Sequence, residues 1–283
     1  MTENSFIIRN MSLDEFRLSV DWARQEGWNP GLSDAECYYA ADPNGFFVGL
    51  LNDEPIATIS AVKYDNSFGF LGFYIVKPEF RGQGYGIRIW NAAMDYLNGC
   101  NIALDGVVAQ QENYKKSGFQ YAYGNLRYEG VAKHVPFSKS GLTEISIIPF
   151  DELRDYDQGF FPASRDSFLK KWYTQTSSYG LAFRKTNTIR GYGLIRPCVS
   201  GYKVGPLYAE DVNVAQTLLS ALVTHLAPGE RFYLDVPQIN QAALQLTETF
   251  KMNLSFETAR MYTNAIPDLP VDKIFSVTSF EIG

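Results

Sequence analysis

The chain has 283 residues, of which 46% are hydrophobic, 15% aromatic and 20% charged, a composition typical of a globular protein long enough for two domains. Its formal net charge of -6, without a dense run of lysine and arginine, argues against a nucleic-acid partner and mildly favours cationic small substrates such as amines. Three widely spaced cysteines and only two histidines argue against a disulfide framework or a metal site. The sequence shows neither a signal-peptide pattern nor a run of ~18 apolar residues, so we expect a cytoplasmic protein without a membrane partner.

The first half of the chain alternates between strand and helix signals. A short strand is expected at residues 6–9, and Ser12 with Glu15 forms a capping box at the start of a helix. The segment from Gly27 to Gly31 breaks this helix, because it contains a proline between two glycines. The other strands are expected at 46–51, 56–64, 68–76, 102–108 and 119–131, and the other helices from Ser33, after Gly86 and over 112–117. The first three of these strands are joined by tight turns, which predicts an antiparallel meander.

The second half repeats this order of elements. Residues 132–143, which include Pro136, are poor in hydrophobic residues and form the predicted linker, so the predicted domains span 1–136 and 143–283. A helix capped by Ser164 is expected first. It is followed by strands at 179–184, 189–198 and 201–208, a helix at 212–226, a strand at 231–236, a helix at 239–250 and a strand at 255–263. One order of elements in both halves indicates a duplicated domain.

Residues 76–86, Val-Lys-Pro-Glu-Phe-Arg-Gly-Gln-Gly-Tyr-Gly, connect a predicted strand to a predicted helix. Glycines at alternate positions allow a tight turn whose N–H groups point the same way, beside the positive end of the helix. Such a site suits a pyrophosphate, to which Arg81 can add a charge-assisted contact. The spacing is not the GxGxxG of dinucleotide-binding folds, and no Gly-Lys-Ser/Thr follows as in a triphosphate-binding loop. The plain alternative is a structural turn between strand and helix.

The segment from Arg81 to Gly86 resembles the acetyl-CoA loop of the GNAT superfamily of acetyltransferases, whose pattern is Gln/Arg-x-x-Gly-x-Gly/Ala. The early segment 27–31, together with Asp42 and Pro43, is similar to the tandem-GNAT (YitH-like) group. The resemblance implies fold class α/β (α+β), with two tandem GNAT-like domains, each a mixed, mostly antiparallel sheet flanked by helices. It also implies acetyl-CoA as the co-substrate and no metal.

The resemblance further implies which residues hold the cofactor. Backbone groups of the strand before the loop pair with the pantetheine arm, and loop amides hold the pyrophosphate. The expected cofactor-binding residues are Tyr74, Ile75, Val76, Arg81, Gly82, Gln83, Gly84, Tyr85, Gly86 and Asn113. Members of the family usually carry an asparagine where this chain has Val107, and Gln110, Gln111 and Asn113 are the candidates to replace its contact.

Tyr114, four residues before Gly118-Phe119, matches the GNAT segment Tyr-x-x-x-Gly-Phe, whose tyrosine protonates the departing CoA thiolate. A phenolic hydroxyl with an ordinary pKa of about 10 can donate to a thiolate. The alternative is a tyrosine that only packs on its helix.

The acceptor pocket of GNAT folds is lined by the early part of the chain, so Trp28, Asn29 and Asp34 are candidate substrate residues. Trp28 is either a pocket wall or a core residue. Asp34, Glu36 and Asp105 are candidate bases or amine-binding carboxylates, or else ordinary surface or capping acids. Asp105 ranks first as a catalytic residue, because it lies on the strand beside the expected acetyl group.

The second half has no matching glycine loop. It has Gly205-Pro206-Leu207-Tyr208-Ala209-Glu210-Asp211 at that place, where the proline removes a donor and the two acids would repel phosphate. Asn240 and Ala243 keep the superfamily's Asn-x-x-Ala. We therefore expect a GNAT-like domain without a functional pyrophosphate loop, which completes the fold or closes the acceptor cleft.

The predicted reaction is direct transfer of the acetyl group of acetyl-CoA to a primary amine, with a small molecule favoured as the acceptor. The backbone N–H of Val76 polarises the thioester carbonyl, water or a carboxylate takes the amine proton, and Tyr114 protonates the thiolate. The alternatives are a non-catalytic acyl-CoA-binding or sensor protein and a transferase that uses a longer acyl-CoA.

Overall fold

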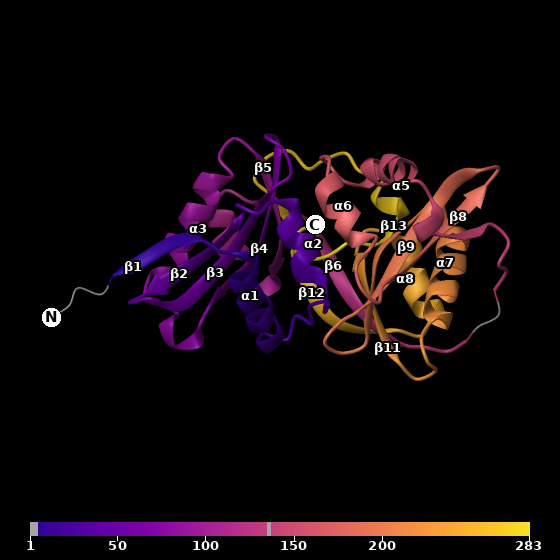
Figure 1. The fold of residues 1–283 in the computed structure, drawn as a ribbon, viewed down its shortest axis with the longest axis horizontal. Helices are drawn as coiled ribbons and strands as arrows, with labels where there is room; N and C mark the ends of the chain where they lie inside the picture. The colour runs from indigo at the N-terminus through magenta and orange to yellow at the C-terminus, as the bar shows by residue number, and fades with distance from the viewer. Residues whose placement is uncertain (1–4, 135–136) are drawn as a thin grey trace.

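The computed structural model describes residues 5–134 and 137–283, so the predicted domain end at residue 136 lies outside the described residues. Figure 1 shows the first half of the chain on one side of an elongated molecule and most of the second half on the other. The elements of the first half are β1 (Phe6–Asn10), α1 (Leu13–Gln25), α2 (Asp34–Ala41), β2 (Phe46–Leu51), β3 (Glu54–Lys63), β4 (Phe68–Val76), α3 (Tyr85–Tyr96), β5 (Asn101–Val107), α4 (Gln111–Lys116) and β6 (Gln120–Val131).

The second half repeats this order and adds one short strand, β13, at its end. Its elements are β7 (Leu142–Glu144), α5 (Phe150–Asp157), α6 (Asp166–Trp172), β8 (Tyr179–Lys185), β9 (Thr188–Pro197), β10 (Tyr202–Ala209), α7 (Val212–Thr224), β11 (Arg231–Pro237), α8 (Gln241–Thr249), β12 (Asn253–Tyr262) and β13 (Ile274–Ser276). In the part of the chain that is described, no helix combines the length and the apolar character that a membrane crossing requires.

Local signals placed most helix ends correctly. The capping box of α1 is confirmed, because the N–H of Glu15 donates to Ser12 Oγ at 3.3 Å and the N–H of Ser12 donates back to Glu15 Oε2 at 2.9 Å. The predicted cap at Ser164 is wrong: Arg165 holds the cap position of α6, and the Ser164 hydroxyl donates to the Asp166 side chain instead. Helix α8 starts later than predicted, because Asn240 caps it by accepting from the N–H of Ala243.

One sheet runs through both halves, and β6 and β12 are exchanged between the halves within it. The strand order is β1-β2-β3-β4-β5-β12-β6-β11-β10-β9-β8-β7. Strand β12 therefore pairs with β5 of the first half, whereas β6 pairs with β11 of the second half. Both strands cross the middle of the molecule in Figure 1. This exchange makes each half depend on the other for its sheet.

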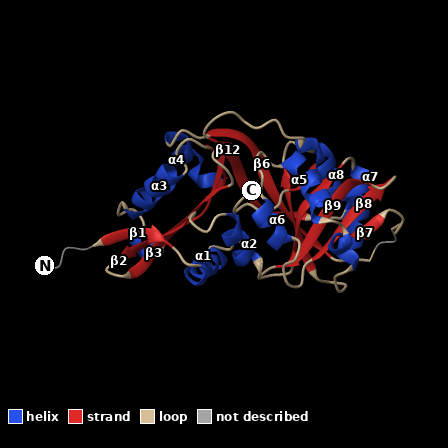
Figure 2. Cartoon of the chain, turned by 45° about the horizontal axis from the view of Figure 1, so that its top comes forward, coloured by secondary structure: helices blue, strands red, loops and turns tan. Residues whose placement is uncertain are grey.

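Helices cover both faces of the first half's sheet, as Figure 2 shows. On one face, α3 buries Ile89 and Trp90 against β2 to β5. On the other face, α1 and α2 bury Phe16 and Tyr38 in a cluster that continues to Trp172 of α6. Burial of each large side chain contributes about 1.5–3 kcal/mol, so this shared cluster holds the two halves together.

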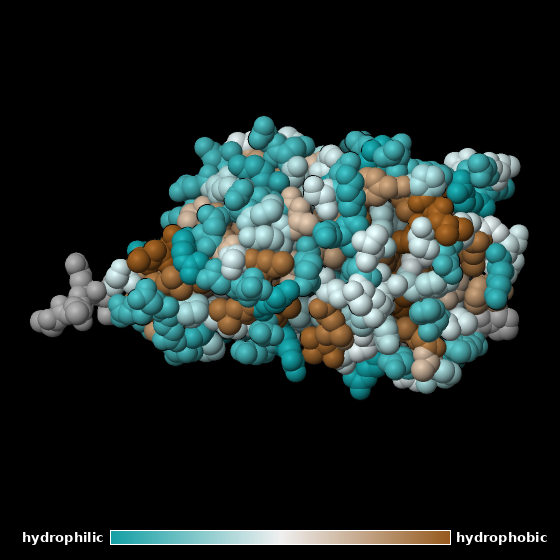
Figure 3. All heavy atoms as spheres, in the orientation of Figure 1, coloured by the Kyte–Doolittle hydropathy of each residue, from teal (hydrophilic) through white to brown (hydrophobic). Residues whose placement is uncertain are grey.

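Among the described residues, the exposed large hydrophobic side chains are scattered over the surface. On the face drawn in Figure 3, hydrophobic side chains lie in several separate areas among hydrophilic ones. The large hydrophobic residues that are exposed, such as Leu32, Ile147 and Ile239, belong to different parts of the chain. Scattered residues of this kind are normal on a protein surface.

Candidate functional site

Strands β4 and β5 separate at the centre of the sheet and leave a slot between them. Their parallel pairing runs from Phe68–Asn101 to Leu71–Leu104, although β4 continues to Val76. A bulge lies where they part: the β3–β4 register shifts between Thr58 and Ser60, and Phe73 has a positive φ of 46°. Bulges bend a strand and often lie next to active sites. Backbone groups of β4 beyond Leu71 are thereby turned toward an open edge.

The glycine-rich loop follows β4 directly and ends at the N-terminus of α3. Gly82 and Gly84 have φ values of 74° and 86°, a conformation that strongly favours glycine. Gly84 is the N-cap of α3 and provides no side-chain hydrogen bond to the first amides of the helix. Free amides at a helix N-terminus form a favourable site for an anion.

A cavity of about 580 Å³ extends from this loop along the slot. That volume lies within the usual range for small-molecule sites. Of the predicted cofactor-binding residues, its lining contains Tyr74, Ile75, Val76, Arg81, Gly82, Gly84 and Gly86. The remaining three lie beside it: Gln83 donates to the Glu79 carbonyl, Tyr85 packs on Phe6 and Phe80, and Asn113 donates to Gln110, which itself lines the cavity.

Arg81 lies at the loop end of the cavity, where its guanidinium contacts a backbone carbonyl and a carboxylate. Its Nε donates to the Val76 carbonyl at 2.8 Å, and its Nη2 pairs with Glu26 at 2.5 Å. About half of the arginine side chain is exposed. The guanidinium therefore stands near the loop amides with donors directed both at the strand and at solvent.

Tyr114 lines the cavity from α4, on the other side of the slot from α1. Its ring stacks on Trp90, with centroids 5.7 Å apart. Burial, helped by the nearby Tyr74, raises the pKa of Tyr114 to about 12. The hydroxyl thus keeps its proton at neutral pH and can act as a donor.

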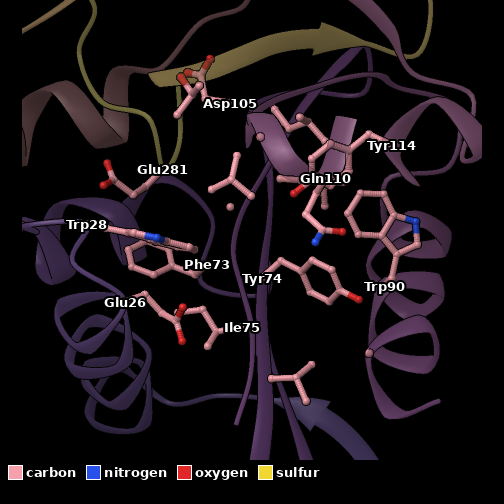
Figure 4. A pocket seen from close by; sticks show the side chains of 18 of the residues that line it. Glu26, Trp28, Phe73, Tyr74, Ile75, Trp90, Asp105, Gln110, Tyr114 and Glu281 are labelled. Carbon is pink, nitrogen blue, oxygen red and sulfur yellow. The ribbon is translucent and has the colours of Figure 1, made fainter. Parts of the chain in front are cut away.

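The other end of the cavity is built by residues distant in sequence. Trp28, a predicted substrate residue, lies here with Phe73. Sequence reasoning missed the rest of this end, which is Arg127, Phe256, Thr258, Phe280 and Glu281. Figure 4 shows Trp28 and Glu281 on one side of β4 and Tyr114 and Trp90 on the other. No local motif marks the missed residues. Arg127 comes from β6, whereas β12 and the C-terminal segment bring in the others from the second half.

Asp105 also lines the cavity, but other side chains already hold its carboxylate. Arg260, its direct partner across β5 and β12, donates from Nε to Oδ1 at 2.9 Å and from Nη2 to Oδ2 at 2.6 Å. Asn125 donates to Oδ1 at 2.7 Å. Burial raises the pKa of Asp105 above its ordinary value, although Arg260 and Asn125 oppose that shift. Most of the hydrogen bonds that the Asp105 carboxylate can accept therefore link β5 to β12 and β6.

Two further predicted substrate residues connect the halves. Asp34 is fully buried and accepts from Arg196 of β9 at 2.8 and 3.2 Å. Burial alone would raise the pKa of Asp34, but Arg196 outweighs it, and the pKa lies below its ordinary value. Asn29 bonds to the second half through the Ser200 backbone. The third early candidate, Glu36, pairs with Arg17 near the surface.

The corresponding slot of the second half is filled by the chain itself. The parallel pairing of β10 and β11 runs from Tyr202–Phe232 to Val204–Leu234, and β13 then lies beside β10. The Ser276 hydroxyl donates to the Val204 carbonyl at 2.7 Å and accepts from the N–H of Asp235 at 2.9 Å. Residues of β13 thus bridge the two strands.

Comparison with known proteins agrees with this geometry. Residues 8–119 match a family model described as the acetyltransferase (GNAT) family, and residues 153–276 match one described as an acetyltransferase (GNAT) domain. Holothin acyltransferase of Pseudoalteromonas sp. is 31% identical over 96% of this chain and 92% of its own length. The uncharacterized N-acetyltransferase YitH of Bacillus subtilis is 27% identical over 59% of this chain and 60% of its own.

Solved structures share the fold along nearly the whole chain. A proposed acetyltransferase from Pyrococcus horikoshii, 23% identical, superposes with a TM-score of 0.85 over 100% of this chain and 98% of its own. A tandem GNAT protein from the clavulanic acid biosynthesis pathway, 11% identical, gives a TM-score of 0.65 over 93% and 100%. The predicted fold class, with two GNAT domains of mixed, mostly antiparallel sheet and flanking helices, is confirmed.

The slot, the glycine loop and the two domain matches define a tandem GNAT acyltransferase. The chain belongs to the GNAT family, homologous to YitH and to holothin acyltransferase, and is an acyl-CoA-dependent N-acyltransferase of class EC 2.3.1.

Proposed function

We propose that this protein transfers the acetyl group of acetyl-CoA directly to a primary amine of a small molecule. The observation that carries the proposal is the slot between β4 and β5, which leads from a glycine loop with uncapped helix amides to an end lined by aromatic side chains. The name of the relative holothin acyltransferase supports a small-molecule acceptor and leaves the length of the acyl chain open.

The loop and Arg81 hold the pyrophosphate, and the open edge of β4 holds the pantetheine arm. The N–H of Lys77 donates to Ile56 of β3. Because backbone N–H groups alternate along a strand, the N–H of Val76 is directed toward the slot, where it can polarise the thioester carbonyl. Gln83, Tyr85 and Asn113 support this binding from beside the cavity.

The acyl transfer then takes place at the slot, with the amine on one side of β4 and Tyr114 on the other. The amine nitrogen attacks the thioester carbon and gives a proton to a base or to water. The carbon–sulfur bond breaks, and Tyr114 donates its proton to the sulfur, which leaves as the CoA thiol. Trp28 forms a wall of the acceptor end, whereas Asp34 and Asn29 hold the second half in place against it.

A screen of CoA release tests this function. Purified protein is incubated with acetyl-, propionyl-, butyryl- or hexanoyl-CoA and with tryptamine, spermidine, glucosamine or amino acids. We expect amine-dependent release, fastest with acetyl-CoA. Faster release with hexanoyl-CoA would mean that the preferred donor is an acyl-CoA with a chain longer than acetyl. Tight acetyl-CoA binding without release in any combination would favour the non-catalytic sensor.

A further inference from the structure

The C-terminal segment, residues 277–283, leaves the second half after β13 and is buried against the first half. Val277, Phe280 and Ile282 are buried, and the Tyr64 hydroxyl donates to the Ile282 carbonyl at 2.5 Å. A side chain at Gly72 of β4 would collide with the carbonyl oxygen of Glu281. The segment is therefore fixed next to the point where β4 leaves β5, and Figure 1 marks the C-terminus between the two halves.

Glu281 lines the acceptor end of the cavity and is only 5% exposed. Its Oε2 lies 3.2 Å from the Tyr38 hydroxyl, but that hydroxyl lies 3.0 Å from Asp34 and has one proton to donate. Its Oε1 lies 3.9 Å from Lys203 Nζ. This buried carboxylate is thus held in place without using its full capacity to accept hydrogen bonds.

The other carboxylates of the lining have firmer partners. Asp105 is held by Arg260 and Asn125 through contacts of 2.6 to 2.9 Å. Glu26 pairs with Arg81 at the loop end and has a side chain one-third exposed. Glu281 is therefore the lining carboxylate best able to accept a proton at the acceptor end.

The surroundings of Glu281 also indicate what kind of amine fits. Trp28, Phe73, Phe256 and Phe280 bring aromatic surface to this end of the cavity. Two buried cationic side chains, Arg127 and Lys203, lie close by, and burial and Arg127 lower the pKa of Lys203. Asp235 already pairs with Arg127, so the selecting feature is the aromatic surface: a flat apolar body would pack on the rings, whereas a polycation would lose its hydration among them.

We propose that Glu281 is a catalytic residue that accepts the proton of the acceptor amine, whose flat apolar body lies among Trp28, Phe73 and Phe280. This rests on the proposed function. As the nitrogen–carbon bond forms, the nitrogen proton moves to Glu281. The carbon–sulfur electron pair goes to the sulfur, which Tyr114 protonates from the other side of β4, as Figure 4 places them. Solvent then takes the proton from Glu281 and returns one to Tyr114.

The test compares Glu281→Gln with Glu257→Gln, the same change at an exposed position of β12, using tryptamine, hydroxylamine and spermidine as probe amines. We expect Glu281→Gln to lower kcat/KM for tryptamine and hydroxylamine about 100-fold or more, the usual contribution of a general base, while the Kd of acetyl-CoA stays unchanged. Glu281→Asp should recover part of the rate, Glu257→Gln should match the unaltered protein, and tryptamine should be preferred to spermidine.

A second variant separates catalysis from charge balance. Glu281→Gln leaves Lys203 without its carboxylate, so the pair Glu281→Gln with Lys203→Met removes both charges. We expect this folded double variant to be as slow as the single one. Recovery of the rate, or a loss below about threefold in Glu281→Gln, would overturn the catalytic role.

The remaining outcomes are also decisive. Faster acetylation of spermidine would overturn the flat acceptor. Acetyl-CoA binding without acetylation of tryptamine or hydroxylamine by the unaltered protein would count against the proposal for Glu281. Failure to bind acetyl-CoA would instead contradict the proposed function itself.

Discussion

Strands β4 and β10 hold corresponding places in the two halves, and each is followed by a helix, but the space beside them is used differently. Beside β4, the slot opens into a cavity, and Gly84 leaves the first amides of α3 without a side-chain cap. Beside β10, β13 fills the slot, and the Asp211 carboxylate accepts from the N–H groups of Asn213 and Val214 at the start of α7.

The second half thus satisfies with its own atoms the groups that the first half leaves open to a ligand. Relative to the proposed binding mode of the first half, a strand stands where the pantetheine arm would lie, and a carboxylate stands where a phosphate would lie at the helix N-terminus. The segment that fills the second slot continues into the acceptor end of the first. We therefore expect one acyl-CoA site per chain, with the second half serving the acceptor.

The largest expected effect comes from closing the anion site of the first half. Gly84→Asp places a side chain at a φ of 86° and a negative charge beside the pyrophosphate. Left-handed strain of about 1–2 kcal/mol, together with charge repulsion, predicts acetyl-CoA binding weaker by about 30-fold or more. Titration calorimetry measures this, with Glu210→Ala in the second half as the matched change, for which the Kd should stay the same.

Removal of the proton donor comes next. Tyr114→Phe should lower kcat by about 100-fold without weakening acetyl-CoA binding, whereas Tyr121→Phe on the exposed part of β6 should leave both unchanged.

The pH dependence of kcat tests the same residue. An acid works in its protonated form, and the pKa of Tyr114 is raised to about 12. The pH profile of kcat should therefore show no fall from this group up to about pH 10. A basic limb that disappears in Tyr114→Phe would contradict this account.

The third prediction concerns the hydrogen bonds by which β13 closes the slot of the second half. Ser276→Ala leaves the N–H of Asp235 and the carbonyl of Val204 without their buried partner. The free energy of unfolding, from urea denaturation, should fall by about 2 kcal/mol, because an unsatisfied buried group costs 1–3 kcal/mol. Exposed Ser140→Ala should change it little, and acetyl-CoA should still bind once per chain. A second bound acetyl-CoA in Ser276→Ala would show that β13 alone had closed the other site.

The smallest effect is expected at the entrance of the open slot. Glu26→Gln frees Arg81 from a partly exposed ion pair worth roughly 0–1 kcal/mol, so acetyl-CoA should bind up to about fivefold more tightly. The exposed change Asp53→Asn should have no such effect. Weaker binding in Glu26→Gln would mean that Glu26 positions Arg81 for the phosphate instead of competing for it.

Sequence signals predicted those features of the two halves that depend only on residues close together in the chain. The Ser12–Glu15 box, the meander from β2 to β4, the glycine loop and Tyr114 depend on neighbours a few residues apart, and each lies in or next to its expected element. The same kind of signal pointed to Glu210 and Asp211 as residues that would repel phosphate, which stays a prediction; in the structure Asp211 caps α7.

What could not be predicted depends on contacts between distant parts of the chain. The exchange of β6 and β12 pairs Asp105 with Arg260, 155 residues away, and so binds the side chain ranked first as a base. Asp34 meets Arg196 across 162 residues, and Glu281 reaches Tyr38 across 243. Periodicity and capping carry no information about such pairs, since they are decided by how the two halves pack.

The most direct test of the account is the stoichiometry of acetyl-CoA binding, measured by titration calorimetry on the purified protein. One molecule per chain, lost in Gly84→Asp and retained in Ser276→Ala, is the expected result. Two molecules per chain, or no heat at all, would contradict the assignment of the open slot to acyl-CoA and of the filled slot to the protein's own strand.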